Sequence, residues 1–477
     1  MVALAAALCL ASGFALVSLG WSRRFPLGLD LLFRGALSIG FGLGVFSVVL
    51  FLCRVAGITN LMAADLLVFA MLVAALRLRT HRASATAPPA SACERAEAWP
   101  FWFQRVVTAS FAISLFAAVY AALRQAVAHP HGGGWDAFAI WNLHARFLAG
   151  PHWRDGFSPR IPWSHPDYPL LLPASVANFW TCLGGDNTAV PEIIGLAFTF
   201  TTVGILFAAL RILRGRVSAM LGAMTLLATP AFVELGTWQY ADVPLSFFLL
   251  GAVALLCLHD ENSQPATAAS SGLLLLAGVA AGFGAWTKNE GVLFLCALIV
   301  ARQLAFRPIG RKNSATARNI SFVRHSAPLL LGIAPLFLLI IYFKHRIAPP
   351  GDLFSDAKTM LGKLLQPARY WAVLKAYGKE FLRFGGWLAI PGTLLLAVLY
   401  FVAGRGDRHG LNPGSRGSAL ALILTVGGYF VIYLITPYEI YWHLRFSLGR
   451  LFLQLWPSTI FLFFLWLGSD NTLPDSK

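Results

Sequence analysis

The sequence has 477 residues, of which 57% are hydrophobic and only 12% are charged. A soluble domain carries about twice that charged fraction, so the composition argues against a soluble globular protein. It predicts an all-α polytopic membrane protein, because repeated apolar runs are long enough to cross a bilayer as helices. The net charge of +16 is explained by basic loops that hold the topology on the cytoplasmic side, without nucleic-acid binding.

Thirteen apolar runs are predicted to be transmembrane helices. In chain order they cover approximately 1–20, 35–53, 61–76, 106–123, 190–208, 217–234, 245–258, 272–287, 291–303, 326–343, 385–403, 419–436 and 451–467. The first run has no basic segment before it and no clear cleavage site after it, which predicts a retained helix and not a signal peptide. We divide the chain into N-terminal helices with a cytoplasmic linker (1–105), a core with a long loop at 124–189 (106–345), and a C-terminal part (346–477).

The cysteines show neither paired nor metal-type spacing. They are Cys9, Cys53, Cys93, Cys182, Cys257 and Cys296. We expect reduced packing residues and not a disulfide framework.

The lysine and arginine residues predict the orientation. Most lie in one set of loops, while the short loops of the opposite set hold only Arg54, Lys288, Arg445 and Arg450. Because short loops decide insertion, the N-terminus is predicted outside and the C-terminus in the cytoplasm. The loop 124–189 is then extracytoplasmic.

Acidic, basic and other polar residues gather on the predicted outer side. They are Asp136 in "GGGWDAF", His165 and Asp167 in "SHPDYP", Glu234, Tyr240 and Asp242 in "ELGTWQYADVP", Lys288, Asn289 and Glu290 in "WTKNEG", and Glu439, His443, Arg445 and Arg450 in "YEIYWHLRFSLGR". Any one of them has a structural explanation; Asp242, for example, could cap a helix that has Pro244 in its first turn. As a set they predict a site, because acids beside cations at membrane depth usually mark one.

Two amphipathic helices are predicted in the loop 124–189. In the first, an apolar stripe carries Phe138, Trp141, Ala145 and Leu148, while Asn142, His144 and Arg146 lie mostly off it and are expected at the surface. The second covers 170–180. Such helices lie in the membrane interface, and their tryptophan-rich faces suit the headgroup boundary, so we expect a site partly open to lipid.

The order of these motifs resembles the GT-C glycosyltransferases. The resemblance is carried by the Trp135–Asp136 pair, two interfacial helices, "HPDYP", "YADVPL", "KNEG" and "YWHLRFSLGR". It covers roughly residues 106–345 and 419–460. More narrowly, these motifs resemble the bacterial members related to protein O-mannosyltransferases and the lipid A aminoarabinose transferase.

The resemblance implies a GT-C-type bundle that uses a polyprenyl-phosphate-linked sugar as donor. It implies that Asp136 is the catalytic base, that His165 and Asp167 assist by positioning acceptor or sugar, and that Lys288 lies near the donor phosphate. Asp242 matches an acid-bearing turn of the family.

Inverting sugar transfer needs a carboxylate to take the proton of the acceptor hydroxyl, and the departing lipid phosphate needs fixed cations. Lys288, Arg445 and Arg450 are the candidates for those cations, and Tyr240, Asp242, Glu290 and His443 complete the expected substrate-binding set.

No cofactor is expected to be required. A divalent metal could bridge Asp136, Asp167 and His165, but their spacing has no ligand-motif regularity.

Other functions stay open. The protein could be a transporter or flippase of an anionic lipid or solute, or a ligase or polymerase that shares the donor chemistry. The acceptor could be a glycan, a lipid or a protein, and the expected location is the bacterial inner membrane, with the site on the extracytoplasmic side. The basic segment 344–384 is either a solvated, partly helical cover or a lid that attracts an anionic substrate.

Overall fold

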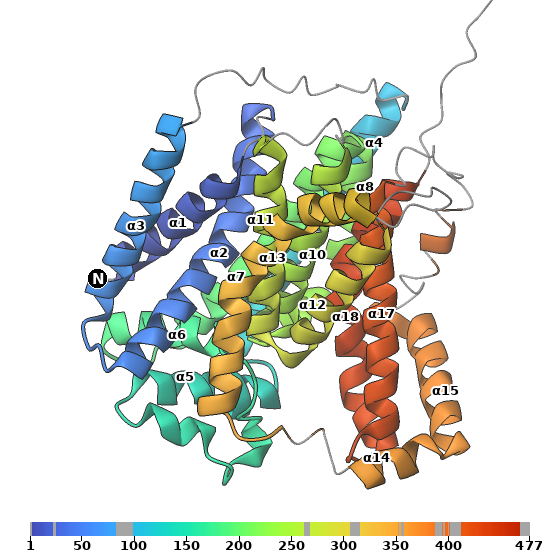
Figure 1. Cartoon of the computed structure of the whole chain (residues 1–477). Coiled ribbons are helices and arrows are strands. Elements are labelled where there is room, and N and C mark those ends of the chain that lie inside the picture. Colours follow the sequence, from blue (N-terminus) through green and yellow to red (C-terminus); the bar gives the residue numbers. More distant parts are fainter. Residues whose placement is uncertain are drawn as a thin grey trace, which may run out of the picture.

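The computed structural model describes residues 2–21, 25–82, 99–261, 268–305, 315–351, 353, 357–386, 394, 396–398, 400 and 412–467. Within these residues the elements are all helices, and they form a bundle (Figure 1). The long helices are α1 (Val2–Gly20), α2 (Leu27–Ala56), α3 (Leu61–Arg82), α4 (Phe101–Ala128), α7 (Ala189–Leu213), α10 (Asp242–Glu261), α11 (Ala268–Thr287), α12 (Asn289–Ala305), α13 (Ala315–Arg346), α17 (Pro413–Ile435) and α18 (Ile440–Trp466). The shorter helices are η1 (Ala137–Trp141), α5 (Asn142–Ala149), η2 (Trp153–Phe157), η3 (Pro162–Ser164), α6 (Leu171–Leu183), α8 (Arg216–Leu227), α9 (Pro230–Thr237), α14 (Ala357–Leu364), α15 (Pro367–Arg383) and η4 (Phe384–Gly386).

The prediction of an all-α polytopic membrane protein is confirmed. Nine of the described helices are long and apolar enough to cross a membrane. The described helices coincide with twelve of the thirteen predicted spans, and the remaining one, 385–403, falls largely outside the described residues.

The predicted span 217–234 is broken. It consists of α8 and α9, whose axes differ by 65° across the break. Pro230 occupies the first position of α9, and proline cannot donate the backbone hydrogen bond that would continue α8. The hydroxyl of Thr229, at the break, accepts a hydrogen bond from the Trp456 indole at 3.0 Å. The polar groups at the break are thus partly satisfied from α18.

Helix α10 lies at the centre of the bundle. Its apolar window is completely buried, and it packs against α7, α11, α17 and α18. A helix that is hydrophobic on all sides is expected in such a place. A buried aspartate lies near each end, and each is paired with an arginine from another helix: Asp260 accepts two hydrogen bonds from Arg302, at 2.5 and 3.1 Å, and Asp242 is described below.

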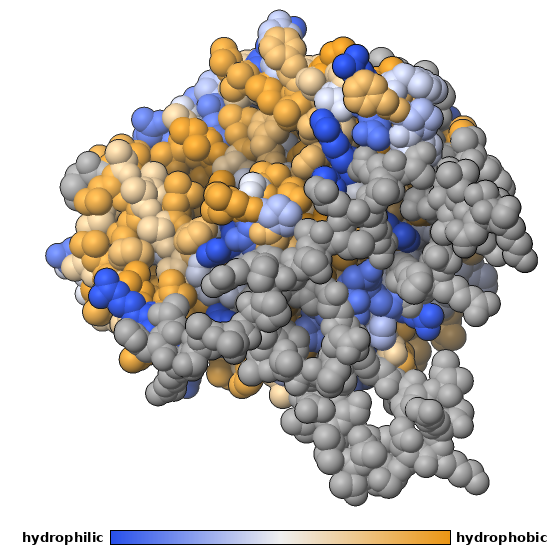
Figure 2. All heavy atoms as spheres, turned by 90° about the horizontal axis from the view of Figure 1, so that it is seen from above, coloured by the Kyte–Doolittle hydropathy of each residue, from blue (hydrophilic) through white to orange (hydrophobic). Residues whose placement is uncertain are grey.

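The loop between α4 and α7 folds into α5, α6 and short helical turns at one end of the bundle, which we call the site end. Helices α5 and α14 both lie at the site end (Figure 1). Figure 2 shows the opposite end of the bundle, where hydrophilic side chains lie among hydrophobic ones. Residues 171–180 of α6 are all buried, and α6 packs against α2 and α5. The second predicted interfacial helix is therefore enclosed by protein.

The basic segment 344–384 is largely helical, and α15 runs beside α17 and α18 (Figure 1). The Arg369 guanidinium donates to the Leu434 carbonyl at 2.7 Å, near the end of α17. Further along α15, Tyr377 packs on Phe430 and Phe452. Most of this segment therefore covers the flank of these two helices.

Candidate active site

Asp136 follows a glycine segment that packs directly on another turn. A Cβ added at Gly133 would lie 2.0 Å from the Trp238 ring, and one at Gly134 would lie 2.3 Å from the Tyr240 hydroxyl. Gly132 has a φ of +91°, which favours glycine. The three glycines therefore let residues 132–134 approach the turn 238–240 closely, and this contact fixes Asp136 at the site end.

Asp242 is the buried anchor of the site. Its side chain is fully buried at the first position of α10, where the helix dipole also favours a carboxylate. One oxygen accepts hydrogen bonds from Lys288 Nζ at 3.0 Å and Gln454 Nε2 at 2.6 Å. The other accepts from Arg450 Nε at 3.0 Å and Nη2 at 2.9 Å. The carboxylate thus ties α10 to α18 and to the α11–α12 turn.

Arg450 connects this anchor to Asp136. Its Nη2 lies 2.7 Å from Asp136 Oδ2, and its guanidinium lies 4.7 Å from the centre of the Tyr240 ring. The side chains of Arg450 and Asp136 are 23% and 19% exposed, whereas Asp242 beneath them is inaccessible. The cation and the acid of this pair are therefore both partly accessible.

The Tyr240 ring packs against the Arg450 guanidinium, and its hydroxyl stays protonated. Burial and the nearby Asp136 carboxylate raise the pKa of Tyr240 to about 12. Its hydroxyl is therefore neutral at physiological pH, and its ring gives the Arg450 guanidinium a cation–π contact.

Lys288 extends the cluster to Glu290. The ammonium group is 4% exposed and lies 2.9 Å from Glu290 Oε1, in addition to its contact with Asp242. Burial alone would lower the pKa of Lys288, but the two carboxylates outweigh it and hold that pKa above its ordinary value. Lys288 is therefore a permanent positive charge. Glu290 Oε2 is buried and has no hydrogen-bond partner among the described residues.

Asp167 forms a second, adjacent cluster. Its Oδ2 accepts from Asn289 Nδ2 at 2.9 Å and from Lys344 Nζ at 3.2 Å. Lys344 Nζ also donates to Asn289 Oδ1 at 2.9 Å. A Cβ on Gly351 would come within 3.0 Å of Asp167 Oδ2, so the chain after α13 passes close over this carboxylate. These contacts join the "HPDYP" segment to the α11–α12 turn and to the end of α13.

Tyr168 lies between the two clusters. Its ring stacks on His165 with centroids 4.7 Å apart and on Trp141 at 5.7 Å. Lys288 Nζ lies 6.0 Å from the ring centre. Burial and the carboxylates of Glu290 and Asp167 raise the pKa of Tyr168 well above its ordinary value. The Tyr168 ring therefore lies between His165, on which it stacks, and Lys288.

The expected surface positions of Asn142 and His144 are wrong. Their relative exposures are 7% and 1%, because the rest of the loop folds over the side of α5 that was predicted to face water. Asn142 Nδ2 donates to Gln239 Oε1 at 2.6 Å, and His144 Nε2 lies 3.3 Å from Ser164 Oγ. Phe138, on the predicted apolar stripe, is 48% exposed. Arg146 pairs with Asp186 at 2.9 Å at the surface, as expected.

The burial of His144 predicts a pH-dependent stability. Burial, assisted by His165, lowers the pKa of His144 to about 4, whereas an unfolded chain binds that proton near pH 6.5. Because the unfolded state then binds more protons, stability is fully present above pH 6.5 and falls as the pH drops towards 4, by about 3 kcal/mol. Comparing urea unfolding at pH 7 and pH 4 for wild type and His144→Gln measures this term. The variant should lose less stability on acidification, and an equal loss in both proteins would contradict the prediction.

Two predicted binding residues lie apart from the cluster. His443 Nδ1 lies 2.9 Å from Thr436 Oγ1, and its ring contacts Tyr433 and Tyr438. Arg445 is exposed, with its guanidinium 5.7 Å from the Phe446 ring. Their assignment to substrate binding stays a prediction.

Sequence reasoning missed several residues of the site. Gln454, Tyr168 and Lys344 were not singled out. Gln454 could have been found, because it follows Arg450 by four residues and so shares its helix face. Lys344 is separated from Asp167 by 177 residues, and no local pattern connects them.

Among the residues that the structure describes, no group of three or more histidine, cysteine, aspartate or glutamate residues is placed to hold a metal ion. The five described cysteines are free, and Cys93 lies outside the described residues.

A comparison with protein-family sequence models matches residues 164–338 to the dolichyl-phosphate-mannose-protein mannosyltransferase family. The matched range covers less than half of the chain. It includes Asp167, Asp242 and Lys288, begins after Asp136 and ends before Arg450. Comparisons with curated proteins and with solved structures gave no match. Together with the apolar helices, the family match supports a membrane-embedded glycosyltransferase of the GT-C class.

Proposed function

We propose that the protein transfers a sugar from a polyprenyl-phosphate donor to an acceptor of the bacterial cell envelope, with inversion at the anomeric carbon. The observation that carries the proposal is the accessible Asp136–Arg450 pair on the buried Asp242 anchor. It puts a carboxylate and a cation side by side at one end of a membrane bundle. There a lipid-borne donor can meet an acceptor from the aqueous phase.

The residues account for both halves of the reaction. The acceptor oxygen attacks the anomeric carbon while its proton passes to Asp136, so that a C–O bond forms to the acceptor. The bond from the anomeric carbon to the phosphate oxygen breaks, and its electron pair leaves with the phosphate. Arg450 stabilises that charge, since charge-assisted bonds from arginine to phosphate are strong. Nη1 of Arg450 forms no hydrogen bond with any described residue and is free to bind the phosphate.

In the proposed reaction, Lys288 acts electrostatically and does not contact the substrate. It is nearly inaccessible and already shared between Asp242 and Glu290. Its contribution is to hold Asp242, and thereby Arg450, in place. We propose that no divalent metal is required, because the Arg450 guanidinium can bind the departing phosphate and stabilise its charge.

The extracytoplasmic side of the inner membrane is the proposed location of the site, from the charge of the short loops. The charged residues of the cluster gather at one end of the bundle and do not follow a path through it, which favours transfer over transport.

A reconstituted transfer assay tests the proposal. The purified protein in liposomes receives a panel of polyprenyl-phosphate sugars with a radiolabelled sugar and a cell-envelope extract as acceptor. We expect label in the extract together with free polyprenyl phosphate, with or without EDTA. Intact donor moved to the other leaflet would support a flippase instead, and growth of a sugar polymer would indicate the polymerase alternative.

A further inference from the structure

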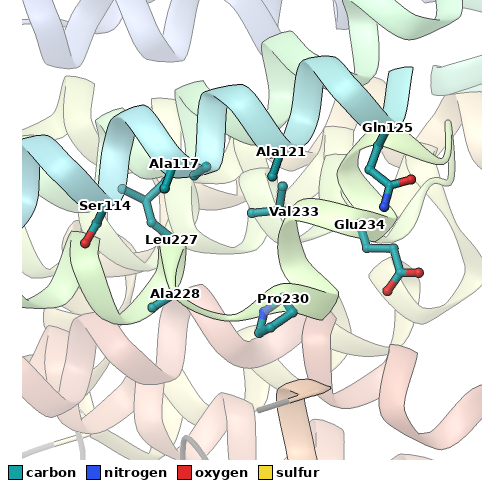
Figure 3. A pocket seen from close by; sticks show the side chains of 10 residues that line it. Ser114, Ala117, Ala121, Gln125, Leu227, Ala228, Pro230, Val233 and Glu234 are labelled. Atoms are coloured by element: carbon teal, nitrogen blue, oxygen red, sulfur yellow. The ribbon is translucent and has the colours of Figure 1, made fainter. Parts of the chain in front are cut away.

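A second candidate binding site lies on the flank of the bundle, between α4 and the broken pair α8–α9. A pocket of about 460 Å³ opens there (Figure 3). Ser114, Ala117 and Ala121 of α4 form one wall, and Leu227, Pro230 and Val233 form the other. This volume is within the range of small-molecule sites. Small side chains on α4 leave space between the helices unfilled, and the chain turns by 65° between α8 and α9 beside that space.

The walls of the pocket are suited to a hydrocarbon chain. Most of its lining side chains are apolar, and α4 is only 17% buried over its apolar window. Because α4 is long and apolar enough to cross a membrane, its unburied surface faces lipid. A lipid chain can therefore enter from the side without crossing the protein.

One end of the pocket is polar. The carboxamide of Gln125 and the carboxylate of Glu234 lie together there (Figure 3). Glu234 is partly buried, and its carboxylate forms no ion pair or hydrogen bond with any residue that the structure describes. A partly buried carboxylate beside an apolar pocket is usually paired with a cation, and Glu234 has no such partner among the described residues.

We propose that this pocket binds a phospholipid with a primary ammonium headgroup, which supplies the missing cation. Its N–H groups donate to the Glu234 carboxylate and the Gln125 carbonyl, while one chain lies between α4 and α8. Arg124, one residue before Gln125, is exposed and can bind the lipid phosphate. The acid and the arginine thus match the two charges of a zwitterionic headgroup. The site is distinct from the Asp136 cluster, and the inference does not depend on the proposed function.

The chemistry of the headgroup gives a test on the wild-type protein. A quaternary ammonium group cannot donate a hydrogen bond, and an anionic headgroup is repelled by Glu234. Native mass spectrometry of the protein in detergent, titrated with phosphatidylethanolamine, its N-methylated forms, phosphatidylcholine and phosphatidylglycerol, measures the preference. We expect about tenfold tighter binding of phosphatidylethanolamine than of phosphatidylcholine, decreasing with each methyl group. Equal binding across the series would overturn the proposal.

Matched variants locate the binding. Glu234→Gln should abolish the preference, whereas Asp186→Asn, an equal charge change on the surface of the loop, should retain it. Ala121→Phe should fill the pocket and abolish binding, whereas Ala112→Phe on the exposed side of α4 should not. Thermal unfolding checks that each variant is folded. A folded Glu234→Gln or Ala121→Phe protein that keeps the preference would show that the lipid binds elsewhere.

Discussion

Replacing Asp136 with asparagine is expected to reduce sugar transfer by about 10²–10⁴-fold, the usual contribution of a general base. The substitution keeps the shape of the side chain but removes its ability to accept the acceptor proton. Arg450 remains held by Asp242 through two hydrogen bonds, so the site should stay assembled. The measurement is the transfer rate with a radiolabelled polyprenyl-phosphate sugar, together with the affinity for that donor.

The control for this experiment is Asp186→Asn in the same loop. Asp186 is 56% exposed, and among the described residues its ion pair is with Arg146 at the surface, so its loss should leave transfer unchanged. An Asp136→Asn protein that transfers sugar within a few-fold of the wild-type rate would exclude Asp136 as the base. Loss of donor binding together with activity would instead assign Asp136 to binding.

Replacing Asp242 with alanine is expected to destabilise the protein by about 3–5 kcal/mol, because it leaves buried cations without their partner. Lys288 and Arg450 would both lose the carboxylate that they share. Arg450 would then be positioned by Asp136 and Tyr240 alone, so activity should fall as well. Equilibrium unfolding of the detergent-solubilised protein measures the stability.

A double variant measures the coupling between Asp242 and Arg450. Arg450→Met combined with Asp242→Ala removes one of the unpaired cations, so it should cost less than the two single changes added together. Asp242→Asn, which can still accept from Gln454 and Lys288, should be milder than alanine. A loss below about 1 kcal/mol for Asp242→Ala, the size typical of an exposed pair, would show that Asp242 is not the anchor described here.

The membrane helices could be read from the sequence because a lipid environment requires long apolar runs with internally satisfied backbones. The break between α8 and α9 was missed, since 217–234 has the hydropathy of a continuous span. It depends on Pro230 and on the contact of Trp456 with Thr229, which joins residues 227 positions apart. Hydropathy averages over a window and does not register such a break.

The misplacement of Asn142 and His144 has a similar cause. A helical stripe shows which side of α5 is more apolar, but not how many neighbours will cover it. Ser164 and Gln239 come from other segments and offer hydrogen bonds to the two polar side chains. A buried polar group is tolerated when it is hydrogen-bonded. The polarity of Asn142 and His144 therefore did not exclude their burial.

Composition and charge placement were enough to predict the membrane class, most of the spans and the gathering of Asp136, Asp242, Lys288 and Arg450 at one end. Each of these follows from a local property, such as the length of an apolar run or the position of a charge between two runs. Which residues form ion pairs with one another inside the site could be seen only in the folded structure. Arg450 lies 208 residues from Asp242, and which acid it contacts is fixed by the crossing of α10 and α18 and by the close packing of Gly133 on Trp238. Such contacts result from the packing of distant segments, which no local pattern of residues encodes.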